Sequence, residues 1–171
     1  GERTLAAGLK RYYATCGFKH PEPIDFERVM EKQSGVELDW YFDEWVNTTR
    51  TLDYAITEVL QVGDSLRITL ARKGEQCMPV DLELLGKDGR SVLYHVPLSL
   101  MRGARPADGD RRPFTTLPAW QWTNPSYQFT VPGHLADLTS IMLDPYRRTA
   151  DMDLTNDRVD LGGGVGGMVR P

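Results

Sequence analysis

Hydrophobic residues recur every three to four positions through the first fifty residues, which is the period of an amphipathic helix. The spacing predicts a first helix that ends at Gly17, and a second that begins at Pro23 and stops near Gly35. The apolar faces of these helices consist of Leu5, Leu9, Tyr12 and Tyr13 in the first and Phe26, Val29 and Met30 in the second.

A third helix is predicted to start near Leu38–Asp39. We expect Asp39 to be its N-cap, because a carboxylate there accepts hydrogen bonds from free N–H groups and favours the positive end of the helix dipole. Too many large apolar residues follow for a single stripe on a solvent-facing helix, so this helix must be covered on more than one side. They are Trp40, Tyr41, Phe42, Trp45 and Val46.

After Thr49 the apolar residues alternate, which predicts a series of short strands. Lys87-Asp88-Gly89 predicts a hairpin turn, and residues 101–118 predict a long exposed loop. Short strands separated by turns indicate an antiparallel β-sandwich, so the expected fold class is α+β. The strand positions are Leu52, Tyr54 and Ile56; Leu66, Ile68 and Leu70; Met78, Val80, Leu82 and Leu84; Val92, Tyr94, Val96 and Leu98; Tyr127, Phe129 and Val131; and Leu138 to Leu143.

The change of period places a domain boundary near residue 50. Residues 1–50 are expected to form a helical segment, and residues 51–157 a β-sandwich. Residues 158–171 include the run Gly162-Gly163-Gly164-Val165-Gly166-Gly167, a composition typical of a flexible tail.

Composition and charge argue against two kinds of partner, nucleic acids and the membrane interior. The 171 residues carry a net charge of −4, so there is no basic field to attract phosphates and we expect no nucleic-acid partner. No apolar run approaches the roughly 18 residues that cross a bilayer, so we expect no membrane span. Cys16 and Cys77 fall in regions of different secondary structure, and we expect free thiols.

Short motifs follow one another in a specific order through the helical segment. They are Phe18-Lys19-His20-Pro21, Asp25-Phe26, Met30-Glu31, Ser34-Gly35, the run Leu38 to Trp45, and the strand opening Asp53-Tyr54. This order resembles the end of the catalytic domain in M1-family zinc metallopeptidases of the aminopeptidase N type, which leads into an immunoglobulin-like β-sandwich. The positions that carry the resemblance most clearly are Leu38, Asp39, Trp40, Phe42, Trp45 and Tyr54.

The resemblance implies that this chain is the C-terminal part of a zinc aminopeptidase, where it would support the catalytic domain of the same polypeptide and help to shape its cleft. Family members bind zinc through an H-E-x-x-H motif, which this chain lacks. His20, His95 and His134 are far apart in the sequence, so we expect no catalytic residue, metal site or cofactor here. Zinc is expected in the parent catalytic domain, and the family favours a soluble protein in an extracytoplasmic or periplasmic compartment.

Acidic residues gather at two places along the chain. We interpret the first group as a helix cap and a solvent face rather than a pair for acid–base catalysis. The second group offers oxygen atoms at the short spacing that suits calcium, but the spacing is not that of an EF-hand, and we predict no metal there. The groups are Asp39, Asp43 and Glu44, and Asp151, Asp153, Asn156 and Asp157.

Trp120 and Trp122 are the candidates for ligand binding. Residues two apart in a strand point to the same face, so these rings either form a platform for a sugar or peptide or cover the sandwich core. The alternative function is therefore a β-sandwich module that binds a protein, peptide or carbohydrate. A fragment would also expose the aromatic face of its helices, and we expect self-association through that face.

Overall fold

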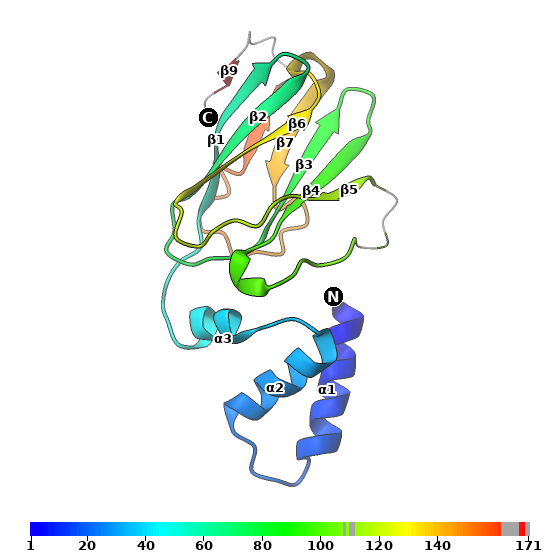
Figure 1. The fold of residues 1–171 in the computed structure, drawn as a ribbon, viewed down its shortest axis with the longest axis vertical. Helices are drawn as coiled ribbons and strands as arrows, with labels where there is room; N and C mark the ends of the chain where they lie inside the picture. Colours follow the sequence, from blue (N-terminus) through cyan, green and yellow to red (C-terminus); the bar gives the residue numbers. More distant parts are fainter. Residues whose placement is uncertain (108, 110–111, 162–167, 170–171) are drawn as a thin grey trace. The chain divides into compact units, whose positions relative to one another are not determined.

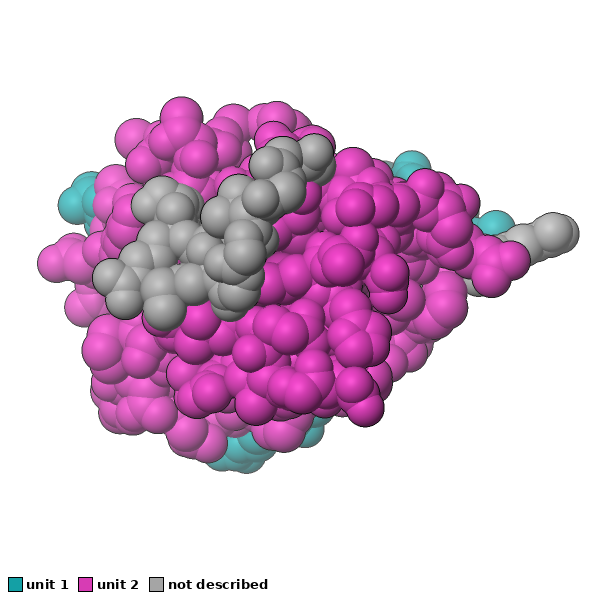
Figure 2. Space-filling model, turned by 90° about the horizontal axis from the view of Figure 1, so that it is seen from above, with its two compact units in different colours: residues 1–49, 100–103 teal, residues 50–99, 104–171 magenta. Residues whose placement is uncertain are grey.

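Helices occupy the first part of the chain and strands the rest in the computed structural model, which describes residues 1–107, 109, 112–161 and 168–169. The helices are α1 (Glu2–Cys16), α2 (Pro23–Ser34) and α3 (Asp39–Val46). Residues 1–49 with 100–103 form one compact unit, the helical unit, and residues 50–99 with 104–171 form a second, the β unit (Figure 2). Among the described residues, no helix has the length and apolar character needed to span a bilayer.

Local sequence sets the ends of the helices. α2 has Pro23 at its first position and a capping box in which the Asp25 carboxylate accepts the N–H of Glu22 at 2.9 Å. It ends at Gly35, whose φ of 72° lies in the left-handed region that glycine tolerates. α1 also stops before Gly17, but Gly17 has a φ of −54°, and Phe18 takes the left-handed conformation instead, with a φ of 61°.

The β unit contains two sheets (Figure 1). One has the strand order β6-β2-β1-β9, and the other has the order β5-β4-β3-β7-β8. Two short 3-10 helices, η1 (Ser99–Met101) and η2 (Leu135–Asp137), lie between strands in the sequence. The strands are β1 (Tyr54–Val62), β2 (Ser65–Arg72), β3 (Val80–Gly86), β4 (Ser91–Val96), β5 (Phe114–Thr116), β6 (Ser126–Pro132), β7 (Leu138–Leu143), β8 (Arg158–Asp160) and β9 (Met168–Val169).

Alternating residues of these strands form the core. Leu66, Ile68 and Leu70 of β2 are fully buried, and β6 lies antiparallel beside them, with Phe129 opposite Ile68 and Val131 opposite Leu66. The predicted fold class is confirmed: three helices precede two sheets, largely antiparallel, in a sandwich-like arrangement.

The predicted hairpin is also present. Residues 87–89 connect β3 to β4, where the N–H of Gly86 donates to the carbonyl of Arg90 at 2.8 Å. Gly89 has a φ of 78°, which explains the glycine at this turn.

The sequence at the C-terminal end is more ordered than predicted. Arg158–Asp160 forms β8 and pairs with β7, and both Val159 and Leu161 are buried, so the prediction of a tail from residue 158 is wrong for this stretch. A three-residue strand contains too little alternation to be recognised from sequence. Gly162–Gly167 lies outside the described residues, whereas Met168–Val169 forms β9 and pairs with β1.

The expected loop over residues 101–118 is interrupted by β5. This strand pairs in parallel with β4, so an entirely antiparallel sandwich is not what forms. The parallel register arises because the long connection after β4 returns to its edge, as parallel pairs require.

Candidate functional site

The helices of the helical unit pack through aromatic rings. Tyr12 of α1 meets Phe26 of α2 edge-on, with ring centroids 5.1 Å apart, and Phe26 meets Phe42 of α3 in the same way at 6.0 Å. The sulfur of Met30 packs against Gly8, where an added Cβ would lie only 2.4 Å from it. These contacts place the beginning of α3 beside α2.

An apolar groove of about 440 Å³ lies within the helical unit. No residue of α3 is buried, and Trp45 and Val46 are 37% and 66% exposed. Within the helical unit α3 is therefore only partly covered, and its cover on a further side stays a prediction. The groove is lined mainly by Leu5, Phe26, Met30, Leu38, Tyr41 and Phe42.

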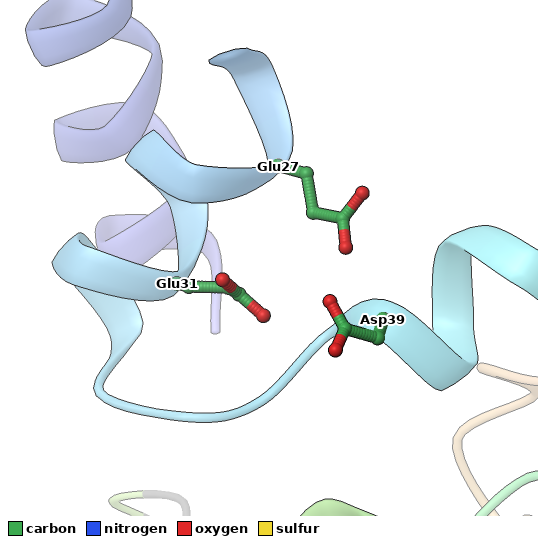
Figure 3. Close-up of side chains that lie close together, drawn as sticks. All are labelled: Glu27, Glu31 and Asp39. Carbon is green, nitrogen blue, oxygen red and sulfur yellow. The ribbon is translucent and has the colours of Figure 1, made fainter. Parts of the chain in front are cut away.

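Three carboxylates meet between α2 and the start of α3 (Figure 3). Glu27 and Glu31 are one turn apart on α2, Asp39 is the first residue of α3, and one oxygen from each lies within 4.8 Å of the other two. Leu38 occupies the N-cap position without a side-chain cap, so the predicted capping role of Asp39 is wrong. The Glu31 carboxylate instead accepts the N–H of Leu38 at 2.9 Å, while Asp39 faces Glu27.

The proximity of these charges changes the protonation of the cluster. A hydrogen bond with Asp39, together with partial burial and repulsion from neighbouring carboxylates, raises the pKa of Glu27 to about 7. Glu27 therefore takes up a proton far more readily than an ordinary glutamate, and its protonated carboxyl can hydrogen-bond to Asp39. Carboxylate oxygens at this separation can hold a proton or a hard divalent cation.

Sequence reasoning identified Asp39 but missed Glu27 and Glu31. The signal in the sequence was the pair of glutamates at i and i+4. Like charges at this spacing repel each other and destabilise an isolated helix, so the pair indicates a role other than helix stability. Asp43, grouped with Asp39 from the sequence, is exposed and accepts the amide N–H of Asn47 at 3.1 Å.

The two candidate tryptophans do not form a platform. Trp120 is only 2% exposed, packs between Tyr54 and Tyr127 with both centroid distances at 5.3 Å, and donates its indole N–H to the carbonyl of Asn124 at 3.0 Å. Trp122 lies in the following turn and is 52% exposed. The predicted shared face is wrong because these residues lie outside a regular strand, and of the two interpretations weighed, the core role applies to Trp120.

Tyr54, the last of the family-like positions, has a structural role in the β unit. Its side chain is buried, and its hydroxyl donates to the carbonyl of Met78 at 3.0 Å. Burial raises the pKa of this phenol well above its ordinary value, which keeps it neutral.

The three histidines differ in their exposure and lie in different parts of the chain. His20 and His134 are exposed, whereas His95 is 2% exposed and its Nδ1 lies 2.8 Å from the Asp81 carboxylate. Burial alone would raise the pKa of Asp81, but hydrogen bonds from His95 and Arg105 outweigh burial and lower it. Among the described residues, the cluster whose ligand atoms lie close enough for a metal is Glu27, Glu31 and Asp39, and it contains no histidine.

Both cysteines are free thiols. Cys16 is half-buried at the end of α1 in the helical unit, and Cys77 is buried in the β unit, where the Arg72 guanidinium contacts its sulfur.

The second acidic group from the sequence holds the segment before β8 against the start of β1. Asp151 accepts the N–H of Tyr54 at 2.8 Å and the N–H of Asp153 at 2.9 Å. The amide of Asn156 donates to Asp53 at 3.0 Å and to Asp153 at 2.9 Å. Asp53 was not part of the predicted group, because it is about a hundred residues away in the sequence.

No model of a known protein family matches this chain, and no curated protein matches it.

Proposed function

We propose that this chain is a non-catalytic C-terminal part of a zinc aminopeptidase of the M1 family, in which the β-sandwich supports the catalytic domain and helps to shape its cleft. The ordered run from Ser34 to Trp45, followed by Tyr54, is the observation that carries the proposal. Zinc and the residues that bind it would lie in the catalytic domain of the parent, outside these 171 residues.

The packing of the helical unit supports the proposal. Some of the family-like residues have partners within the chain: Phe42 packs on Phe26, and the N–H of Leu38 is held by Glu31. Trp45 contacts the Tyr41 ring, with centroids 6.1 Å apart, and keeps 37% of its surface exposed. A helix with this composition fits a joint between domains better than a solvent-facing surface.

An exposed apolar stripe along α1 points to the same need for a partner. Leu5, Leu9 and Tyr13 lie at i, i+4 and i+8 on one side of the helix and are 54%, 48% and 70% exposed. Covering a large apolar side chain contributes about 1.5–3 kcal/mol, so a domain packed on this stripe would gain several kcal/mol. The catalytic domain of the same polypeptide is the partner that the proposal assigns to it.

The proposal is tested by the reading frame that contains this chain and by activity. We expect sequence upstream of residue 1 to encode H-E-x-x-H and a later zinc-binding Glu. The isolated 171-residue chain should release no amino acid from aminoacyl p-nitroanilides, with or without added zinc. Peptidase activity of the isolated chain that survives a chelator would overturn the proposal, as would an upstream sequence without the motif.

The alternative, a β-sandwich binding module, now depends on Trp122. Trp120 is buried in the core, so Trp122 is the exposed ring of the pair. Loss of binding to a peptide or glycan array on replacing Trp122 by alanine, with the fold intact, would favour this alternative.

A further inference from the structure

A pocket of about 560 Å³ lies within the β unit, beside the hairpin that joins β3 to β4. Its apolar wall includes Leu84 of β3, Val92 of β4 and Leu138 at the start of β7. The volume falls in the range of small-molecule sites, which combine an apolar wall with a few polar groups that fix the orientation of the ligand. The polar groups of this pocket therefore decide which class of ligand it suits.

Tyr94 of β4 contributes a buried hydroxyl to the pocket. The residue is 8% exposed and lies opposite Leu82, which is fully buried, so both side chains lie on the same face of the sheet. The Tyr94 hydroxyl forms no hydrogen bond with any described residue. Buried tyrosine hydroxyls usually have a partner, and that of Tyr54 donates to the carbonyl of Met78 at 3.0 Å. The hydroxyl of Tyr94 is therefore left for a group that enters the pocket.

The Tyr94 hydroxyl is a neutral group. Burial raises the pKa of this phenol, so the hydroxyl keeps its proton and can both donate and accept a hydrogen bond. Because Leu84 and Val92 beside it offer only apolar contacts, the part of a ligand that enters here is apolar along its length and carries one polar atom at its end.

The rim of the pocket carries two cationic and two anionic side chains. Two of them engage each other: the Asp88 carboxylate accepts the backbone N–H of Arg90 at 2.9 Å and lies 3.7 Å from its guanidinium. The side chains of Lys87 and Asp137 form no ion pair or hydrogen bond with any described residue. Their backbones are adjacent, since the N–H of Lys87 donates to the carbonyl of Asp137 at 2.8 Å. One cation and one anion therefore start from neighbouring points of the rim.

This pair of opposite charges discriminates between classes of ligand. A simple carboxylate would be attracted by Lys87 but repelled by Asp137, and the reverse holds for a simple amine. A zwitterion matches both charges when its carboxylate lies at Lys87 and its ammonium group at Asp137. An α-amino acid carries both groups on one carbon, and its side chain is free to extend from there along the apolar wall.

We propose that this pocket binds an apolar α-amino acid as a zwitterion, held at the rim by Lys87 and Asp137. Its side chain would lie against Leu84 and Val92, with a polar atom at the Tyr94 hydroxyl. The side chain of tryptophan, a large apolar ring with one N–H group, has this combination of properties. The proposal does not rest on the peptidase relationship, because it uses residues of the β unit alone.

The test uses the 171-residue chain and isotope-labelled L-tryptophan in equilibrium dialysis at pH 7. We expect one saturable site with a Kd of about 0.1–1 mM, an affinity that is ordinary for a ligand of this size. Tyr94→Phe removes the hydroxyl and keeps the ring, so it should bind L-tryptophan about three- to tenfold more weakly. Its Tm should not fall, since the hydroxyl has no partner within the described chain to lose.

Two analogues of L-tryptophan test the assignment of the charges. Tryptamine lacks the carboxylate, and indole-3-propionate lacks the ammonium group. Lys87→Gln should weaken the binding of L-tryptophan and indole-3-propionate but not that of tryptamine. Asp137→Asn should weaken the binding of L-tryptophan and tryptamine but not that of indole-3-propionate. Each loss should be about two- to fivefold, because ion pairs at an exposed rim are weak.

Lys10→Gln is the matched control for Lys87→Gln, because Lys10 is an exposed lysine of α1 in the helical unit. It should bind L-tryptophan like the original chain, and so should Trp122→Ala. The proposal is overturned by the absence of saturable binding at millimolar L-tryptophan, by binding that Tyr94→Phe leaves unchanged, or by binding that Trp122→Ala abolishes. If the two charge variants had the same effect on all three molecules, the assignment to a zwitterion would be wrong.

Discussion

Replacing Asp157 by asparagine should stabilise the protein, although most substitutions of buried residues destabilise. Asparagine keeps the shape of the side chain and removes the charge. Burial, followed by repulsion from Asp151, Asp144, Asp53 and Asp153, raises the pKa of Asp157 from 3.8 to about 7 in the folded protein. Each pKa unit corresponds to about 1.4 kcal/mol, so the ionised carboxylate costs the folded state about 4 kcal/mol at most.

The sign of the pH dependence follows from the raised pKa. Between about pH 4 and pH 7 the folded state holds a proton that the unfolded state has lost, so the stability contributed by this group falls as the pH rises through that range. The cost is absent below pH 4 and complete above pH 7. Asp157→Asn should therefore gain up to about 4 kcal/mol over the original chain at pH 8 and close to nothing at pH 4.

Urea unfolding in EDTA at pH 4, 6 and 8, followed by tryptophan fluorescence, measures this difference. Trp120 reports from the core of the β unit because it is only 2% exposed. Asp64→Asn is the matched control, since the Asp64 side chain is 98% exposed, and its stability change should stay within about 0.5 kcal/mol. The reasoning is refuted if Asp157→Asn is no more stable than the original chain at pH 8, or if its advantage does not change with pH.

Further substitutions test other parts of the account. Glu27→Gln should stabilise the helical unit above pH 7 but not at pH 5. The pKa of Glu27 is raised by the hydrogen bond with Asp39, by burial and by repulsion from neighbouring carboxylates, so ionisation above pH 7 removes that hydrogen bond and adds repulsion, whereas glutamine stays neutral; helical circular dichroism during thermal unfolding measures this. Trp120→Ala should cost about 3–5 kcal/mol in urea unfolding, whereas Trp122→Ala should change stability by less than about 0.5 kcal/mol; similar costs for both would contradict their different burial. The double change Leu9→Ser with Tyr13→Ser should reduce self-association in sedimentation velocity without lowering stability by more than about 1 kcal/mol, and an unchanged sedimentation profile would exclude this face of α1 as the contact.

The alternation of apolar residues was sufficient to predict the long strands and the order of helices and strands. It works where a strand is long enough for one face to be buried, as in β2 with Leu66, Ile68 and Leu70. It failed for β5 and β8, which have three residues each and form because a neighbouring strand offers hydrogen bonds. It also predicted wrongly that Trp120 and Trp122 share one face. Trp120 packs in the core against Tyr54 and Tyr127, whereas Trp122 lies in an exposed turn.

The acidic sites show a different limit of sequence reasoning. Asp39 is of a residue type that caps helices and lies near the start of α3. Leu38, however, occupies the N-cap position, and the Asp39 carboxylate lies beside that of Glu27. Asp53 and Asn156 are joined by a hydrogen bond across 103 residues, and only the fold brings them together. Spacing along the chain reveals ligand sets that lie in one segment, and it does not reveal sets assembled from several segments.

The proposed role as the non-catalytic part of a zinc aminopeptidase is tested by one aminopeptidase assay that compares the full product of the reading frame with the 171-residue chain. If the proposal is right, the full product contains zinc and releases N-terminal residues from peptides in a reaction that a chelator abolishes and zinc restores. The 171-residue chain should have no such activity under the same conditions. A complete protein without zinc-dependent peptidase activity, or an isolated chain that cleaves peptides, would contradict it.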